Sequence, residues 1–237
     1  MEQRDETAIT LHGLFAGYGR GTVLHGITAR VPRSGVTAVV GPNGSGKSTL
    51  LSVAAGVVAP TGGSVRRSHA RRPAVVVQRS AVSDALPITV EETVAMGRWA
   101  HRGPWRRLTK RDHRIVMECM AHLGVLDLAP RRLGELSGGQ RQRALVAQGL
   151  AQESDLLLLD EPTTGLDAEA RERISAVLDR AGADGTTVVQ ATHDLEAAMR
   201  ADHCLLLAEG RLAAQGAPAS VLTPAALAGI WGLPRLR

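Results

Sequence analysis

This 237-residue chain is poor in aromatic residues, with one Tyr, one Phe and three Trp. With so few aromatic rings, the chain lacks the repeated aromatic side chains on which proteins that bind single-stranded nucleic acid stack the bases. The two cysteines, Cys119 and Cys204, lie far apart without nearby histidines, so we expect free buried thiols rather than a disulfide or a metal site. No apolar run approaches the roughly 18 residues needed to cross a bilayer, and the first residues lack the apolar core of a signal peptide.

Lysine is equally rare, because Lys47 and Lys110 are the only two lysines among 28 basic residues. The chain uses arginine by default, so a lysine at position 47 suggests a site that needs a compact ammonium group. The formal net charge is +5, and the arginine pairs are scattered along the chain. We expect a charged surface rather than a nucleic-acid groove, because aromatic residues do not alternate with these arginines.

A glycine-rich segment at residues 41–49 has the spacing of a phosphate-binding loop. Its flanks fit, since residues 36–40 predict a buried strand and residues 47–55 predict a helix that ends at Gly56. Backbone amides of such a loop surround phosphate oxygens, Lys47 reaches the outer oxygens, and Ser48 binds Mg²⁺. The candidate nucleotide ligands are Gly41, Pro42, Asn43, Gly44, Ser45, Gly46, Lys47, Ser48 and Thr49.

A second group of polar residues follows two predicted apolar strands. Residues 156–159 end in Asp160 and Glu161, and residues 186–191 are followed by His193. Ligands of open parallel sheets bind at the carboxyl ends of the strands, so we expect these three side chains near the phosphate loop. Asp160 would hold Mg²⁺ through water, Glu161 would polarise the attacking water, and His193 would contact the γ-phosphate.

The remaining pattern predicts an α/β fold into which a helical segment is inserted. Residues 8–14 and 24–31 alternate like two antiparallel strands, and the turn between them exposes Tyr18, which could stack on an adenine ring. The other predicted elements are a strand at 74–77, helices at 90–96, 111–123 and 139–152, a helix at 169–181 ended by Gly182, a helix at 195–201, and short strands around 209–210.

Together these motifs, with Leu-Ser-Gly-Gly-Gln at 136–140, resemble the ATP-binding cassette (ABC) family of transporter ATPases over nearly the whole chain. The resemblance implies an α/β fold: a P-loop NTPase (RecA-like) core with an N-terminal antiparallel β subdomain and an inserted helical subdomain at about 87–152. The single ABC domain would span residues 7–235. The resemblance assigns adenine stacking to Tyr18 and coupling between the two ATP sites to Asp167. It assigns catalysis to Glu161, His193 and Gln78, and Mg²⁺ binding to Ser48, Gln78 and Asp160. The residues that would bind the ATP held by the partner subunit are Leu136, Ser137, Gly138, Gly139 and Gln140.

The same resemblance implies ATP and Mg²⁺ as cofactors and a homodimer in the ATP-bound state. In that dimer the signature of one subunit would complete the ATP site on the other. The expected partners are integral-membrane permease subunits and, indirectly, a solute-binding protein. The protein would lie at the cytoplasmic face of the cell membrane, held there by the permease, and no nucleic-acid partner is expected.

Within the family, residues 86–90, 96–98 and 150–152 look like the ATPases of importers for zinc, manganese or chelated iron, and residues 103–107 and 191–195 look closer to the zinc and manganese branch. The alternatives are the ATPase of an iron-siderophore importer, the ATPase of an exporter built from separate subunits, and a soluble cassette ATPase acting on DNA or ribosomes. The last is disfavoured because the chain has neither a long coiled-coil insertion nor a second cassette.

Residues 80–105 are the predicted docking surface for a short permease helix. They combine Trp99, Trp105 and several arginines in an aromatic-poor chain, and such residues are frequent anchors at interfaces. The alternative is that Trp99 and Trp105 pack inside the helical piece.

Overall fold

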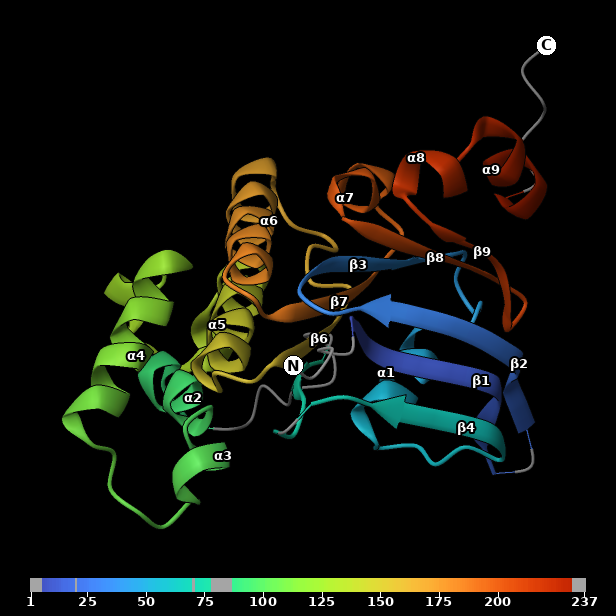
Figure 1. The fold of residues 1–237 in the computed structure, drawn as a ribbon. Helices are drawn as coiled ribbons and strands as arrows, with labels where there is room; N and C mark the ends of the chain where they lie inside the picture. Colours follow the sequence, from blue (N-terminus) through green and yellow to red (C-terminus); the bar gives the residue numbers. More distant parts are fainter. Residues whose placement is uncertain (1–5, 20, 70, 78–86, 232–237) are drawn as a thin grey trace.

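A computed structural model describes residues 6–19, 21–69, 71–77 and 87–231, and its centre is a six-stranded sheet (Figure 1). Five of these strands run parallel, and the last pairs antiparallel with its neighbour. The order across the sheet is β5 (Ala74–Val76), β6 (Leu156–Asp160), β7 (Thr187–Thr192), β3 (Gly35–Val40), β8 (His203–Ala208) and β9 (Arg211–Gly216).

A separate three-stranded antiparallel sheet has the order β2 (Gly21–Pro32), β1 (Thr7–Tyr18) and β4 (Gly62–Arg67). The predicted N-terminal pair of strands is therefore confirmed, with both strands longer than their sequence pattern indicated. β4 was not predicted, because it opens with two glycines and ends with two arginines. Such a composition is unusual for a central strand but is tolerated at the edge of a sheet.

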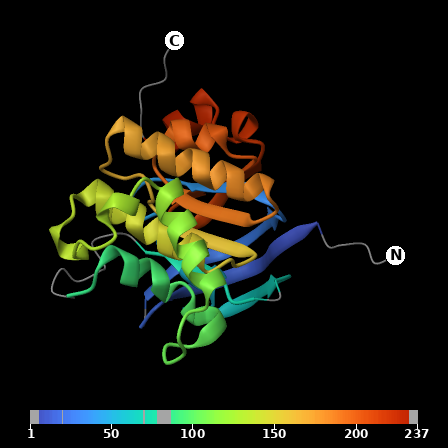
Figure 2. The same ribbon diagram turned by 90° about the vertical axis from the view of Figure 1, so that its left-hand side faces the viewer.

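Helices cover both faces of the six-stranded sheet. α5 and α6 lie against one face, with α2 and α4 packed outside α5, as Figures 1 and 2 show. α1 lies on the other face, between the two sheets. The helices are α1 (Lys47–Ala55), α2 (Val90–Met96), α3 (Trp99–Arg102), α4 (Lys110–His122), α5 (Gly138–Ala151), α6 (Ala168–Ala183), α7 (Leu195–Arg200), α8 (Pro218–Val221) and α9 (Pro224–Trp231), with 3₁₀ turns η2 (Leu126–Leu128) and η3 (Leu133–Glu135).

The central strands divide their apolar side chains between two cores. Leu157 and Leu159 of β6 pack with the inserted helices, whereas Leu156 and Leu158 pack with α1 and the antiparallel sheet. This split follows from the alternation of side chains along a strand. A strand buried on both faces reads as a continuous apolar run, which is why residues 156–159 could be recognised from the sequence.

One detail of the sequence prediction is wrong. α6 does not end at Gly182 but runs to Ala183. A Cβ on Gly182 would lie 2.9 Å from Cα of Gly35, so this glycine permits close packing of α6 on β3 and is no helix stop. The short strands predicted around residues 209–210 are β8 and β9, and Glu209 and Gly210 form the turn between them, with φ of 48° and 71°. Positive φ at both central residues is typical of a tight hairpin turn.

The two cysteines, which we expected to be free and buried, match that expectation in part. Cys119 and Cys204 are both free; Cys204 is buried, whereas Cys119 is only partly so. Burial raises the pKa of each thiol to about 12.

Trp105 does not pack inside the helical segment, because 94% of its surface is exposed. Across the described ranges, no helix has the length and apolarity to cross a membrane.

Candidate nucleotide site

The phosphate loop connects β3 to α1, as the sequence predicted. Gly44 and Gly46 adopt left-handed backbone conformations with φ of 78° and 98°. A Cβ on Gly46 would also lie 2.6 Å from Leu24 of β2, so position 46 excludes larger residues for two reasons. Gly46 is the N-cap of α1 and supplies no side-chain hydrogen bond to its first turn. The amides there are free to bind an anion, which the helix dipole also favours.

Lys47 is the first residue of α1 and is 6% exposed. Its Nζ donates hydrogen bonds to the carbonyl oxygens of Gly41 at 2.9 Å and of Pro42 at 3.1 Å. Burial lowers the pKa of Lys47, and the carboxylates of Glu161 and Asp160 act against that shift. The ammonium group therefore lies inside the curve of the loop, where phosphate oxygens would bind.

Ser48 and Asp160 form a pair suited to a hydrated divalent cation. Burial raises the pKa of Asp160, and hydrogen bonding from the Ser48 side chain acts against that shift. Oδ1 of Asp160 and Oγ of Ser45 are buried and have no hydrogen-bond partner in the part of the chain that the structure describes. Buried polar atoms are normally satisfied, so these two oxygens mark places that a bound group would fill. Hard oxygen ligands of this kind suit Mg²⁺.

Glu161 and His193 meet at the carboxyl ends of β6 and β7. Oε1 of Glu161 lies 3.4 Å from Nδ1 of His193, and Oε2 accepts a hydrogen bond of 2.8 Å from Oγ1 of Thr164. The backbone amide of Glu161 donates to the carbonyl of Ala191. The structure thus brings together the acid and the histidine that the sequence singled out. Asp194, next in the chain, is the N-cap of α7.

The residues of the signature segment, 136–140, open α5. Ser137 is its N-cap and forms a capping box with Gln140: Oγ of Ser137 accepts from the Gln140 amide, and Oε1 of Gln140 accepts from the Ser137 amide. Gly138 and Gly139 then form the start of the helix. Among the described residues, no hydrogen bond or ion pair joins this segment to the phosphate loop of the same chain. The segment presents an exposed helix N-terminus, the feature that favours anions.

Three further predicted residues have different outcomes. Tyr18 is the last residue of β1 and is 56% exposed, and Val23 of the paired strand β2 lies close to Gly46. Asp167 is the N-cap of α6, where its Oδ1 accepts from the amide of Ala170 at 2.8 Å. Gln78 and residues 80–86 of the predicted docking surface lie outside the described part of the chain.

Sequence reasoning missed two features of this region. Thr164 was given no role of its own, yet its hydroxyl donates a hydrogen bond to Oε2 of Glu161. α9 was not predicted at all, although Gly229 and Ile230 line a cavity of about 450 Å³ together with Asn43 and Gly44 of the phosphate loop. The spacing of three residues between Glu161 and Thr164 was the available signal for the first feature. For α9 the signal was Pro224, a residue common at the first position of a helix.

Comparisons with known proteins agree with this geometry. The family model for the ABC transporter matches residues 24–164. The chain is 38% identical to the ferric enterobactin transport ATP-binding protein FepC of Escherichia coli (strain K12), over 96% of this chain and 89% of that protein. It is 33% identical to the iron(3+)-hydroxamate import ATP-binding protein FhuC of Bacillus subtilis (strain 168), over 92% of this chain and 85% of that one.

Solved structures match the fold as well. A structure described as an inward-facing metal-chelate type ABC transporter has a TM-score of 0.86 and 29% identity, over 96% of this chain and 90% of that chain. An ATP-binding cassette dimer in a post-hydrolysis state with ADP and phosphate has a TM-score of 0.78 at 24% identity, which supports the fold. With the phosphate loop, the acids and the signature segment in place, the chain belongs to the ABC transporter family and is an ATPase that uses ATP with Mg²⁺.

Proposed function

We propose that this chain is the ATP-hydrolysing subunit of an importer for chelated iron. The observation that carries this proposal is the likeness to FepC and FhuC, both named for iron chelates and both matched over more than nine-tenths of this chain. The likeness to a metal-chelate type transporter supports the same cargo class. The zinc or manganese cargo predicted from the sequence remains the second candidate, favoured by a relative in Chlamydia pneumoniae named as an ATP-binding protein of a metal transport system.

The described side chains suggest how hydrolysis proceeds. The uncapped amides of α1 and the Lys47 ammonium would bind the β- and γ-phosphates. Ser48 and Asp160 would hold Mg²⁺, which neutralises charge that develops on the phosphate oxygens. Glu161 would accept a proton from the attacking water, with Thr164 and His193 fixing its two oxygens.

The signature segment supports a head-to-tail dimer. Ser137 and the amides of Gly138 and Gly139 form an exposed helix N-terminus, and in the described ranges no hydrogen bond or ion pair joins it to the phosphate loop of its own chain. A second copy would place this N-terminus on the γ-phosphate of ATP bound to the first. Members of this family dimerise and act with membrane permeases, so we place the protein at the cytoplasmic membrane face, bound to a permease and served by a solute-binding protein.

Uptake by the assembled transporter tests the cargo. The chain would be reconstituted with its permease in vesicles that contain ATP, and uptake of a ferric siderophore would be compared with uptake of zinc and manganese. ATP-dependent accumulation of the ferric chelate, absent in Glu161→Gln, is the expected result. Accumulation of zinc or manganese instead would overturn the chelated-iron proposal and leave the ATPase assignment intact.

A further inference from the structure

The connection between α3 and α4, residues 103–109, presents a tryptophan to solvent. Trp105 is 94% exposed, far more than Trp99 at 42%, and the adjoining Arg106 and Arg107 are also exposed. We call residues 103–109 the Trp105 loop. Burying an indole is strongly favourable in water, so a ring held almost fully exposed at a loop tip is a candidate contact residue.

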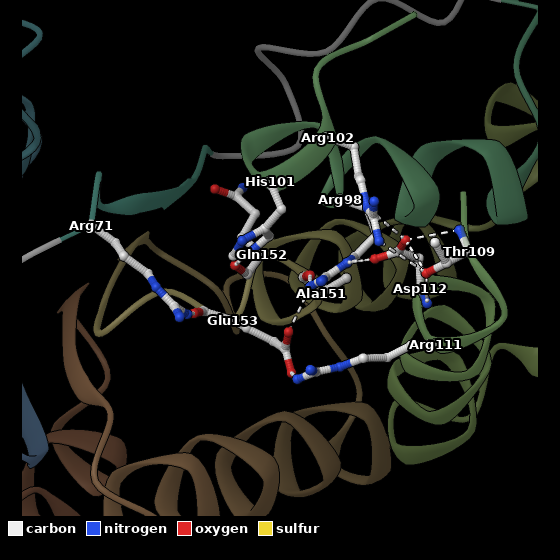
Figure 3. Close-up of polar contacts among 10 residues, drawn as sticks. All are labelled: Arg71, Arg98, His101, Arg102, Thr109, Arg111, Asp112, Ala151, Gln152 and Glu153. Carbon is white, nitrogen blue, oxygen red and sulfur yellow. Dashed lines mark hydrogen bonds and ion pairs between the residues drawn. The ribbon is translucent and has the colours of Figure 1, made fainter. Parts of the chain in front are cut away.

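The base of the Trp105 loop is fixed by polar contacts (Figure 3). Arg102 precedes the loop and donates to Oγ1 of Thr109, which ends it, at 3.3 Å. Asp112 accepts from both sides of the base: from Arg102 at 3.1 Å, and from the amide and hydroxyl of Thr109 at 2.9 and 2.6 Å. The two ends of the loop are therefore tied together, and the tip between them projects outward.

The same cluster anchors the loop to the rest of the helical segment. Arg98, 4% exposed, donates to Asp112 at 3.0 Å, to the carbonyl of Ala151 at the end of α5 at 2.7 Å, and to Glu153 at 2.9 Å. The cations at the base are thus matched by carboxylates. The tip and the adjoining first residue of α4 differ, because Arg106, Arg107 and Lys110 make no ion pair within the described part of the chain.

The basic residues at the start of α4 do not stabilise that helix. Lys110 and Arg111 occupy the first turn of α4, where the positive end of the helix dipole disfavours basic side chains. Asp112 in that turn is buried and already paired, and Arg111 lies 3.8 Å from Glu153, so the charge of Lys110 is the one left without a carboxylate partner in the described part of the chain. The excess of positive charge beside Trp105 therefore suits a negatively charged partner outside the chain.

We propose that the Trp105 loop docks on the anionic phospholipid head groups of the membrane in which the permease lies. Tryptophan is enriched at the head-group level of bilayers, and clustered basic residues are attracted to anionic lipid surfaces. A permease helix would need a stripe of apolar anchors, whereas this tip offers a single ring among cations. This inference rests on the proposed function, since the permease brings the chain to a membrane.

Vesicle binding of the purified full chain tests the assignment. Vesicles of phosphatidylcholine mixed with phosphatidylglycerol are expected to sediment the protein, and vesicles of phosphatidylcholine alone are expected not to. High salt should release it, because exposed charges are screened. Trp105→Ala and the double variant Arg106→Glu/Arg107→Glu should each weaken binding, the latter by about tenfold or more. Both should keep the ATPase activity of the unmodified chain, which separates failure of this inference from failure of the proposed function.

A charge-matched control replaces two exposed arginines in other elements, Arg180→Glu/Arg211→Glu. Its binding should stay within about twofold of the original, since only charges close to the membrane contribute. In a Trp99→Phe/Trp231→Phe background, the emission of Trp105 should shift to the blue with anionic vesicles. Equal binding by the original chain and the loop variants would overturn the proposal. So would a blue shift that needs the permease protein and not the lipid, which would identify an acidic protein partner instead.

Discussion

Nδ1 of His193 lies 3.4 Å from Oε1 of Glu161, and these two residues come from the ends of neighbouring parallel strands. The other carboxylate oxygen of Glu161 accepts a hydrogen bond from Thr164. Glu161 also has a positive φ of 49°, a conformation that is uncommon outside glycine and occurs at functional sites. The acid is held in one orientation at the edge of the sheet, as a general base requires.

Glu161→Gln is expected to stop hydrolysis while preserving ATP binding. The amide keeps the shape of the side chain but cannot accept a proton from water, so turnover should fall by about two to four orders of magnitude. Phosphate release measures the first effect and binding of a fluorescent ATP analogue the second. With Mg²⁺ and ATP, size-exclusion chromatography should show a stable dimer.

The matched control is Glu172→Gln, which changes an exposed glutamate of α6 that pairs with Arg200. Because exposed ion pairs contribute little, this variant should hydrolyse ATP at the original rate. A Glu161→Gln protein that elutes only as a monomer with Mg²⁺ and ATP would contradict the two-chain arrangement.

Lys47→Ala and Ser137→Arg should fail in different ways. Lys47 lies inside its own phosphate loop, so its removal should weaken nucleotide binding as well as hydrolysis. Ser137 lies at the exposed start of α5, so an arginine there should leave nucleotide binding intact and block closure on the second chain. Nucleotide titrations and turnover measured side by side distinguish the two; equal loss of binding in both variants would refute separate half-sites.

The parts of the fold that could be predicted are those with a local signal. β3, the phosphate loop and α1 follow one another within about twenty residues, and each has its own pattern: a buried apolar run, spaced glycines and helical periodicity. Asp160 and His193 lie at the same edge of the sheet because the strands that precede them are parallel, so their carboxyl ends are neighbours. Ligands of open parallel sheets bind at this edge.

The features that escaped prediction depend on contacts between distant residues. The local sequence predicts that Gly182 ends a helix. The structure shows instead that a glycine is needed there because the helix packs on the backbone of Gly35, almost 150 residues away in the sequence. Arg98 is a charged residue that the sequence would place at the surface, yet Asp112 and Glu153 allow its burial. Sequence spacing carries no record of either contact.

Gly182→Ala should therefore destabilise the chain by about 1–3 kcal/mol, because the new methyl group would overlap the backbone of Gly35. Gly229→Ala is the matched control, since Gly229 is also helical and a Cβ there meets no atom within 4 Å in the described structure. Alanine in a helix is favoured over glycine, so the control should be neutral or slightly more stable. Urea unfolding monitored by circular dichroism measures both, and equal stability of the two variants would remove the packing explanation for Gly182.

Asp112→Asn should also lower stability, for an electrostatic reason. Asp112 is 2% exposed and accepts hydrogen bonds from Thr109 and from two arginines, one of them buried. Removing one partner of a buried ion pair leaves the other charge uncompensated, so we expect a loss of about 3 kcal/mol at neutral pH. Urea unfolding at pH 7 provides the measurement, with the exposed Asp127→Asn as a control of nearly unchanged stability.

The pH dependence distinguishes this charge effect from a loss of packing. Hydrogen bonds from Thr109, with those of Arg98 and the charge of Arg102, hold the pKa of Asp112 well below its usual range, against the effect of burial. A carboxyl group with a lowered pKa in the folded state stabilises the fold above the unfolded pKa of about 3.9. That stabilisation is lost as the pH falls below this value towards the folded pKa.

The difference in unfolding free energy between the original chain and Asp112→Asn should therefore be constant from pH 7 to about 5 and become smaller below about pH 4. A difference that stays constant down to the acid unfolding transition would show that Asp112 acts through shape and not through its charge.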